Sequence, residues 1–154
     1  MPGNLFATFQ SRFPADRSKP FIVVPSGPTL SYADLEARSA QFAHVLVGAG
    51  VKPGDRVAVQ VDKSPEAIFV YLACLRAGAV LLPLNTAYQP EELEFFLSDA
   101  APAAVICQPA REAQLAGIVA KTGIGAALLT LGADGSGSLT EKAEGQSTDF
   151  ATIP

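Results

Sequence analysis

The apolar residues of the chain fall into short blocks with two kinds of pattern. Residues 67–75 are apolar on every side of a helix, and residues 79–84 form an apolar run without the alternation of a half-exposed strand. Residues 64–66 (Ser-Pro-Glu) supply the N-cap, the first-turn proline and the first-turn acid that begin a helix, and Gly78 suits its C-terminal turn. The pattern therefore predicts a helix covered on all sides, followed by a strand with both faces covered.

A membrane-spanning helix is the alternative interpretation of residues 67–84, because the run approaches the length of the shortest bilayer spans. Arg76, Gly78 and Pro83 interrupt it with a charge, a helix terminator and a proline. These residues divide the run into a helix and a strand, so we predict no membrane partner.

The N-terminal part of the chain carries a short helix signal and a hairpin signal. Asn4 is predicted to cap a helix whose apolar residues Leu5, Phe6 and Phe9 press one side onto the domain. Residues 21–24 and 29–30 flank a Pro-Ser-Gly-Pro turn, which predicts a small hairpin.

An amphipathic helix is predicted next. Residues 31–34 (Ser-Tyr-Ala-Asp) form a start resembling a capping box, and glycines at 48 and 50 end the helix. Its inward face is predicted to consist of Leu35, Ser39, Phe42, Ala43 and Leu46.

Alternating strands and helices fill the middle of the chain. Strands are predicted at 56–61, 79–84, 103–107 and 126–131, with helices from 90 to 100 and from 111 to 121 between the later ones. Glu91 and Glu92 are interpreted as partners of the helix dipole rather than catalytic acids. The order predicts an α/β fold: a doubly wound, mostly parallel sheet flanked by helices, with a small N-terminal hairpin.

Length and composition set the domain plan. The 154 residues suit one domain, 49% of them are hydrophobic, and a net charge of −4 gives no reason to expect nucleic acid as a partner. We predict an α/β subdomain at residues 1–131 and a polar connector at 132–154 that leads to further polypeptide. No basic and apolar leader opens the sequence, so cytoplasmic localisation is expected.

The cysteines and the single histidine are assigned no chemistry. Cys74 and Cys107 fall in predicted buried elements without metal-ligand spacing, so they are expected to be small buried hydrophobic residues, and no metal site is predicted. His44 lies opposite the apolar face of its helix and is expected to be solvated.

Ligands of doubly wound sheets bind beyond the carboxyl ends of the strands, here residues 62–64, 85–88 and 108–109. None of these segments contains a glycine-rich phosphate loop, and the glycines of residues 132–137 stand in the connector without a strong helix behind them. Lys63 could meet an anion at a helix N-terminus, but an exposed strand-end lysine is the simpler interpretation. The residues alone therefore predict no catalytic group in this chain.

Five motifs in order resemble the N-terminal part of the acyl-adenylate-forming enzymes, which include acyl-CoA synthetases, peptide-synthetase adenylation domains and luciferases. They are L-S-Y-A-D-L at 30–35, G-V-K-P-G-D-R-V-A at 50–58, L-R-A-G-A at 75–79, P-L-N at 83–85 and L-S-D-A at 97–100. Arg76 stands where many members have lysine. Asn85 in place of aspartate favours the acyl-CoA synthetase branch, and residues 4–7 with 82–88 are similar to bacterial malonyl-CoA synthetases.

The resemblance implies an activity that needs more polypeptide than this chain. In the family, a carboxylate attacks the α-phosphate of ATP to give an acyl-adenylate and pyrophosphate, and the CoA thiol then displaces AMP, with Mg²⁺ and cationic groups neutralising charge. The Ser/Thr/Gly-rich loop that holds the ATP phosphates and the lid with a catalytic lysine follow the segment corresponding to this chain. The expected partners are therefore the remainder of the polypeptide and a small, malonate-like carboxylic acid.

The resemblance also implies a place for CoA. Asn85, Thr86 and Tyr88 would lie near the CoA entrance, although a plain strand-end turn is the alternative there. Two other functions stay open for the chain: a free-standing α/β binding or dimerisation module, and the adenylation domain of a peptide synthetase.

Overall fold

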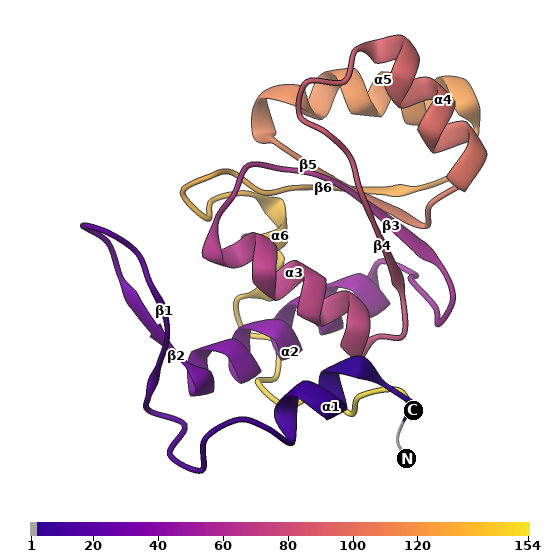
Figure 1. Ribbon diagram of the computed structural model, residues 1–154. Coiled ribbons are helices and arrows are strands. Elements are labelled where there is room, and N and C mark those ends of the chain that lie inside the picture. The colour runs from indigo at the N-terminus through magenta and orange to yellow at the C-terminus, as the bar shows by residue number, and fades with distance from the viewer. Residues whose placement is uncertain (1–2) are drawn as a thin grey trace.

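The computed structural model describes residues 3–154, so the first two residues of the predicted subdomain lie outside the described residues. The described chain forms a four-stranded parallel sheet and a separate two-stranded antiparallel hairpin. Helices cover both faces of the sheet, and the hairpin extends to one side (Figure 1). This arrangement confirms the predicted fold class.

The elements follow one another in an order close to the predicted one. They are α1 (Leu5–Gln10), β1 (Pro20–Val23), β2 (Thr29–Ser31), α2 (Tyr32–Gly48), β3 (Arg56–Gln60), α3 (Pro65–Arg76), β4 (Val80–Pro83), α4 (Pro90–Ala100), β5 (Ala104–Cys107), the 3₁₀ turn η1 (Pro109–Arg111), α5 (Glu112–Thr122), β6 (Ala127–Thr130) and α6 (Ser138–Ala143).

The strand order of the parallel sheet is β4-β3-β5-β6. From β3 the chain passes through α3 to β4 at one edge, then returns through α4 to β5 on the other side of β3. Figure 1 shows α4 and α5 above the sheet and α2, α3 and α6 below it. The direction of winding thus reverses between β3 and β5, and such a reversal places a crevice at the carboxyl ends of these two strands.

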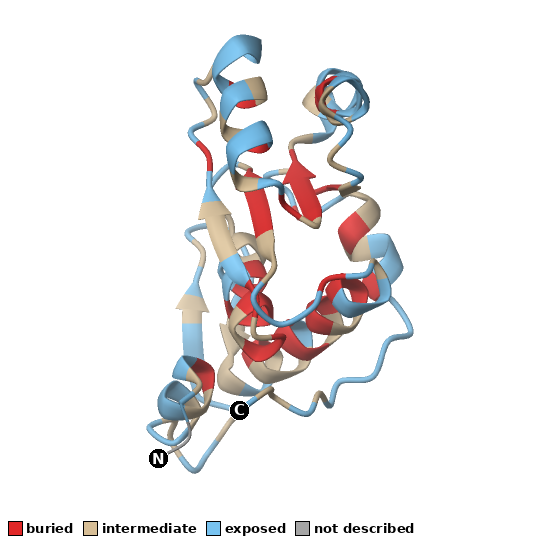
Figure 2. Cartoon of the chain, turned by 90° about the vertical axis from the view of Figure 1, so that its right-hand side faces the viewer, coloured by how far each residue is buried: buried red, intermediate tan, exposed pale blue. Residues whose placement is uncertain are grey.

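Alternation along the two inner strands produces two cores. Val57 and Val59 of β3 pack with the α2 and α3 layer, whereas Ala58 between them packs with α4 and α5. In β5 every residue is buried, and successive side chains again enter opposite cores. Figure 2 shows the buried residues gathered at the sheet and at the inward sides of the helices.

Local capping explains where two of these helices begin. The Ser31 hydroxyl accepts a hydrogen bond from the Asp34 amide at 3.1 Å, and the Asp34 carboxylate accepts one from the Ser31 amide at 2.7 Å. This is the capping box predicted for α2. Ser64 caps α3 through its side chain alone, which accepts a hydrogen bond from the Ala67 amide at 3.1 Å, with Pro65 in the first turn.

The prediction that α3 is covered on all sides is wrong. Ile68 and Tyr71 are 42% and 39% exposed, on a side of the helix that neither the sheet nor α2 covers. The prediction that the following strand is covered on both faces is wrong as well, because β4 is an edge strand and Val80 is 52% exposed. An edge position suits Pro83, which has no amide to donate to a further strand.

Arg76, at the end of α3, is buried beneath the N- and C-terminal segments and is only 5% exposed. Its guanidinium donates to the Glu36 carbonyl at 2.8 Å, the Ser39 hydroxyl at 2.9 Å and the Phe150 carbonyl at 3.1 Å. It also lies over the Phe6 ring, 4.5 Å from the centroid. Burial lowers the pKa of Arg76, and attraction to Glu36 opposes that shift. One side chain therefore joins α1, α2, α3 and the C-terminal segment.

His44 lies at the surface as expected, but it is only partly solvated, because the C-terminal segment covers part of its ring. A ring nitrogen of His44 lies 2.7 Å from the Asp149 carbonyl oxygen, and its ring meets that of Phe150 edge to face at 4.9 Å. The signal was absent from the helix itself, since the covering residues lie about a hundred positions away in the sequence.

Residues 132–154, predicted as a polar connector, pack on the rest of the chain. Leu139 and Ala143 of α6 are buried in the core beside α2 and α3. The Ile153 amide donates to the Arg76 carbonyl at 2.9 Å, and the Asn4 side-chain amide donates to the Ile153 carbonyl at 2.8 Å. Asn4 also caps α1 through the Phe6 amide, as predicted. The two ends of the described chain accordingly meet beside α1 (Figure 1).

Candidate functional site

The carboxyl edge of the parallel sheet is where the predicted site residues come together. The segments that follow β3, β4 and β5 lie side by side there because these strands are neighbours in the sheet. The crevice at the winding reversal is crossed by a hydrogen bond from the Gln108 side chain to the Asp62 carboxylate, at 2.8 Å. The structure therefore places all three segments singled out in the sequence at one edge.

The loop of residues 84–89 joins β4 to α4 and carries the three residues predicted near a CoA entrance. Asn85 is exposed, and its side-chain oxygen accepts a hydrogen bond from the Ala87 amide at 2.9 Å. Thr86 and Tyr88 are half-buried, and the Tyr88 ring stacks on that of Phe96 with centroids 5.0 Å apart. Asn85 thus faces solvent, while Tyr88 fixes the loop to α4.

Two side chains that sequence reasoning missed hold this loop from outside. The Gln60 side chain at the end of β3 donates to the Asn85 carbonyl at 2.8 Å. Arg111 donates to the Thr86 carbonyl at 2.7 Å and to the Tyr88 carbonyl at 3.2 Å. A usable signal was a polar glutamine directly after the apolar residues of β3, since such a buried amide needs a partner.

A hollow of about 510 Å³ lies beside the loop, between the ends of β3 and β4. Asp62, Lys63, Asn85 and Thr86 supply its polar groups, and Val61 and Leu84 its apolar lining. Lys63 is exposed at the N-terminal end of α3, which agrees with the simpler of its two interpretations. The hollow offers one cation, one carboxylate and amide and hydroxyl groups, which suits binding of a polar molecule rather than nucleophilic catalysis.

The glycine-rich segment of residues 132–137 lies against the start of α3. Its amides are used internally: Gly132 donates to the Ser136 carbonyl at 2.7 Å, and Gly135 donates to the Gly132 carbonyl at 3.0 Å. A side chain added at Gly135 would come within 2.8 Å of the Glu66 carboxylate. A phosphate here would meet that negative charge and find these amides occupied, which argues against a phosphate-binding role.

Both cysteines are free and buried, as predicted. Burial raises the pKa of the Cys74 thiol to about 12 and, with a smaller contribution from Glu112, that of Cys107 to about 11. Neither thiol carries appreciable negative charge at neutral pH, so neither is a nucleophile. No group of three His, Cys, Asp or Glu side chains within residues 3–154 is arranged to hold a metal ion.

We expect the folded protein to resist thiol alkylation. Iodoacetamide at pH 8 should modify Cys74 and Cys107 about a hundredfold or more slowly than in urea, because each unit of raised pKa removes about nine-tenths of the thiolate. Mass spectrometry of the two cysteine peptides over time measures both rates. Rapid labelling of either cysteine in the folded protein would contradict the burial described above.

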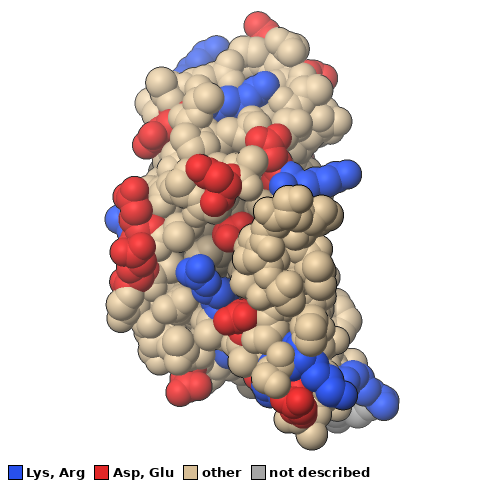
Figure 3. Space-filling view, turned by 90° about the vertical axis from the view of Figure 1, so that its left-hand side faces the viewer, with Lys and Arg blue, Asp and Glu red and all other residues tan. Residues whose placement is uncertain are grey.

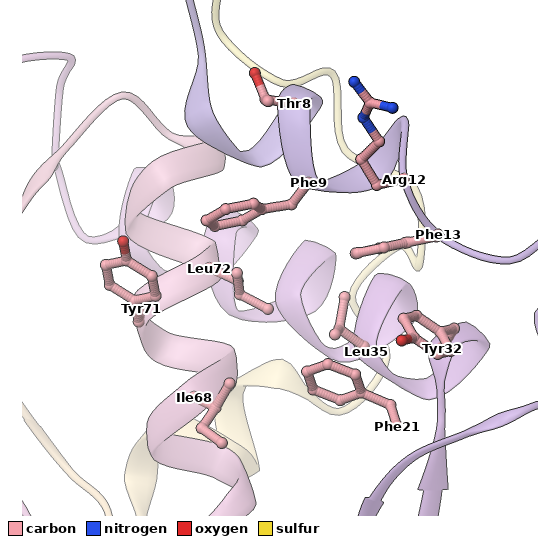
Figure 4. A pocket seen from close by; sticks show the side chains of 10 residues that line it. All are labelled: Thr8, Phe9, Arg12, Phe13, Phe21, Tyr32, Leu35, Ile68, Tyr71 and Leu72. Carbon is pink, nitrogen blue, oxygen red and sulfur yellow. The ribbon is translucent and has the colours of Figure 1, made fainter.

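An apolar groove farther along α3 contrasts with the polar edge. It has a volume of about 470 Å³ and lies between α1, the hairpin, α2 and α3. Figure 4 shows its aromatic and aliphatic side chains converging from these elements, among them Phe9, Phe21, Tyr32, Ile68 and Tyr71. It holds no catalytic set of residues, and its exposed rings and side chains form a surface that favours contact with apolar groups.

The charged residues do not point to a nucleic-acid interface. On the face shown in Figure 3, acidic and basic side chains are interspersed and no continuous basic surface is present. Among the described residues no helix is long and apolar enough to cross a membrane. The interrupted run of residues 67–84 is a helix followed by a strand, as predicted.

The signature of the AMP-binding enzymes matches residues 9–152, which is nearly the whole chain. The chain belongs to the AMP-binding enzyme family. The crystal structure of ATP-bound MatB from Rhodopseudomonas palustris superposes on it with a TM-score of 0.94 and 49% sequence identity. The match covers 99% of this chain and 30% of MatB, a malonyl-CoA synthetase. This AMP-binding chain therefore has the fold of the N-terminal portion of an adenylate-forming enzyme, and its sequence is similar to that part of MatB.

Other members of the AMP-binding family share shorter stretches. Feruloyl-CoA synthase from Amycolatopsis sp is 38% identical over 94 residues, which is 61% of this chain and 19% of that enzyme. A linear gramicidin synthase from Brevibacillus parabrevis is 37% identical over 79 residues, which is 51% of this chain and 1% of the synthase. The chain thus spans a small part of each relative, and both CoA ligases and peptide synthetases are among them.

Proposed function

We propose that this chain is the N-terminal scaffold of an ATP-dependent acid–thiol ligase that forms malonyl-CoA from malonate, ATP and CoA through an acyl-adenylate. The observation that carries the proposal is the 49% identity to MatB over 99% of the chain. Asn85 agrees with it, since the acyl-CoA synthetase branch has asparagine after Pro-Leu where the alternative branch has aspartate.

The groups found at the carboxyl edge of the sheet indicate which parts of the reaction this chain would support and which the remainder of the polypeptide would supply. The described residues supply a rigid loop and a polar hollow, without an assembled nucleophile and base. We infer that the groups that hold ATP and Mg²⁺ and that act in catalysis come from the remainder of the polypeptide. The exposed side chains of Phe9, Phe21, Ile68 and Tyr71 fit the same scheme, because a further part of the protein packed on the groove would bury them.

The proposed CoA entrance is the loop that carries Asn85, Thr86 and Tyr88. The loop lies at the carboxyl edge, the position where ligands of doubly wound sheets bind, and the hollow beside it is open. The exposed Asn85 amide and the half-buried Thr86 hydroxyl suit the amides of the pantetheine arm, and the Tyr88 ring is already packed on α4.

The purified 154-residue chain, given ATP, Mg²⁺, malonate and CoA, is expected to release no pyrophosphate above the rate without protein. The full-length enzyme is expected to release pyrophosphate in a malonate-dependent reaction and to form malonyl-CoA. A coupled pyrophosphate assay and mass spectrometry of the thioester measure the two outcomes. Turnover by the chain alone would overturn the scaffold role, and a full-length enzyme that activates other acids but not malonate would overturn the substrate assignment.

A peptide-synthetase adenylation domain is the second candidate, favoured by the similarity to the gramicidin synthase. The two functions differ in the acid that is activated and in the thiol that accepts the acyl group. Amino-acid-dependent pyrophosphate exchange with transfer to a carrier protein, and without thioester formation on free CoA, would establish the second candidate.

A further inference from the structure

The loop of residues 85–88 is held more firmly than a strand-end turn requires. Three of its carbonyl oxygens, those of Asn85, Thr86 and Tyr88, each accept a hydrogen bond from a long side chain outside the loop. Within the loop, the Ala87 amide donates to the Asn85 side chain, and the Tyr88 amide donates to the Asn85 carbonyl at 3.1 Å. Hydrogen bonds therefore fix both carbonyl groups and amide groups of this short loop.

The two donors come from different neighbouring elements. Gln60 ends β3 and is fully buried, whereas Arg111 lies in η1, just beyond β5. Because the planar guanidinium presents its donors as a fixed fork, Arg111 spans two carbonyls at once, which a single ammonium group does not reproduce. The ends of β3 and β5 thus reach across to the loop that follows β4.

Burying the Gln60 side chain costs free energy, so a requirement for fold stability alone does not explain why a glutamine stands at this position. Its side-chain oxygen has no hydrogen-bond partner among the described residues, and an unsatisfied buried polar atom is unfavourable. A leucine at this position would avoid that cost and fill similar space. What the glutamine gains is the bond to the Asn85 carbonyl, so its role is to fix the loop.

We propose that Gln60 and Arg111 are positioning residues that hold the loop of residues 85–88 in the shape required for thiol transfer. The inference rests on the proposed function, in which this loop lies at the CoA entrance. In that step the CoA sulfur forms a bond to the acyl carbon, the bond from that carbon to the phosphate oxygen breaks, AMP leaves with the electron pair, and the thiol proton passes to solvent.

The expected signature is a separation of the two half-reactions in the full-length enzyme. Arg111→Ala should raise KM for CoA about tenfold, the change expected for two lost hydrogen bonds. Malonate-dependent exchange of pyrophosphate into ATP, measured without CoA, should change less than about twofold, because the donors do not touch the adenylation step. Gln60→Leu should act in the same direction with a smaller effect.

Two further variants separate geometry from charge. Arg111→Lys keeps the cation but loses the fork, so its KM for CoA should lie between those of the wild type and Arg111→Ala. Lys121→Gln removes a cation of α5 whose carboxylate partner, Glu94, lies on α4, and it should leave both half-reactions unchanged. Full activity of Arg111→Lys would show that only charge matters and would overturn the proposal, as would an equal loss in both half-reactions of Arg111→Ala.

Hydrogen exchange tests the positioning without turnover. In Arg111→Ala the peptide containing residues 85–88 should exchange about tenfold faster, whereas peptides of β3 and β5 should be unchanged. Unchanged exchange of the loop peptide would overturn the positioning role. A wild-type enzyme without any malonate- or CoA-dependent reaction would contradict the proposed function instead, and the exchange result would still decide whether these side chains hold the loop.

Discussion

Replacing Arg76 by alanine is expected to lower the free energy of unfolding of the 154-residue protein by about 3 kcal/mol. The substitution leaves the buried Ser39 hydroxyl and the carbonyls of Glu36 and Phe150 without their donor. It also opens a space at the face of the Phe6 ring over which the guanidinium lies in the wild-type protein. Urea unfolding followed by circular dichroism measures the change.

Arg38→Ala is the matched control for this prediction. Arg38 lies on α2, as do Glu36 and Ser39, but its side chain makes none of these buried contacts, so its loss should change stability by less than about 0.5 kcal/mol. Equal stability of the two variants would show that the interactions of Arg76 do no more than offset the cost of burying its charge.

Gly137→Ala is expected to destabilise the protein by about 3 kcal/mol or more. Gly137 has φ +133°, a conformation that other residues rarely adopt, and a Cβ atom there would lie 2.3 Å from the Thr130 carbonyl oxygen. The backbone has little freedom to yield, because Thr130 and Ser138 each donate a backbone amide to the other's hydroxyl at 2.9 Å. Thermal unfolding measures the loss as a lower Tm.

Gly117→Ala should have the opposite sign. Gly117 lies inside α5, and an added Cβ there meets nothing within 4 Å. The substitution should therefore stabilise the protein by about 0.5–1 kcal/mol, mainly by restricting the unfolded chain. If both glycine variants lowered Tm alike, the strain assigned to residue 137 would be refuted.

The elements whose signals are local could be predicted from the sequence. Ser31 with Asp34, and Ser64 with Pro65, announce helix starts through atoms within four residues of one another, and the structure contains both caps. Apolar runs bounded by turns likewise indicated β3, β5 and β6. Their parallel pairing followed from the alternation of strands with helices, because consecutive parallel strands need such crossovers.

The exposures that were predicted wrongly depend on contacts far away in the sequence. The apolar sequence of α3 indicates that all sides of the helix favour burial, but it does not indicate which protein surface would cover Ile68 and Tyr71. For β4, composition alone does not separate a central strand from an edge strand, although Pro83 was a usable signal. The burial of Arg76, for which no prediction was made, and the partial cover over His44 come from residues 149 and 150, which no helical periodicity could connect with them.

The sequence predicted where in the fold the candidate site lies, but not which side chains make contacts there. The rule that ligands bind beyond parallel strands led to residues 62–64, 85–88 and 108–109, and these segments do meet. Gln60, as a polar residue at a strand end, gave a signal that was not used, but its partner and those of Arg111 could not be predicted, because they are backbone carbonyls of another loop and carbonyls carry no sequence signal. The role of Asn85, Thr86 and Tyr88 at a CoA entrance stays a prediction.

The burial of Arg76 between Phe6 and Phe150 has a consequence for synthesis on the ribosome. Phe150 follows Arg76 by 74 residues. At a translation rate of 5–20 residues per second, the ring and carbonyl of Phe150 are synthesised on the order of 4–15 s after Arg76. During that interval the Arg76 guanidinium of the nascent chain stays partly exposed beside apolar side chains of α1 and α3. Stalling translation before residue 150 should therefore leave this region open to proteases and chaperones, although every strand of the parallel sheet has already been made.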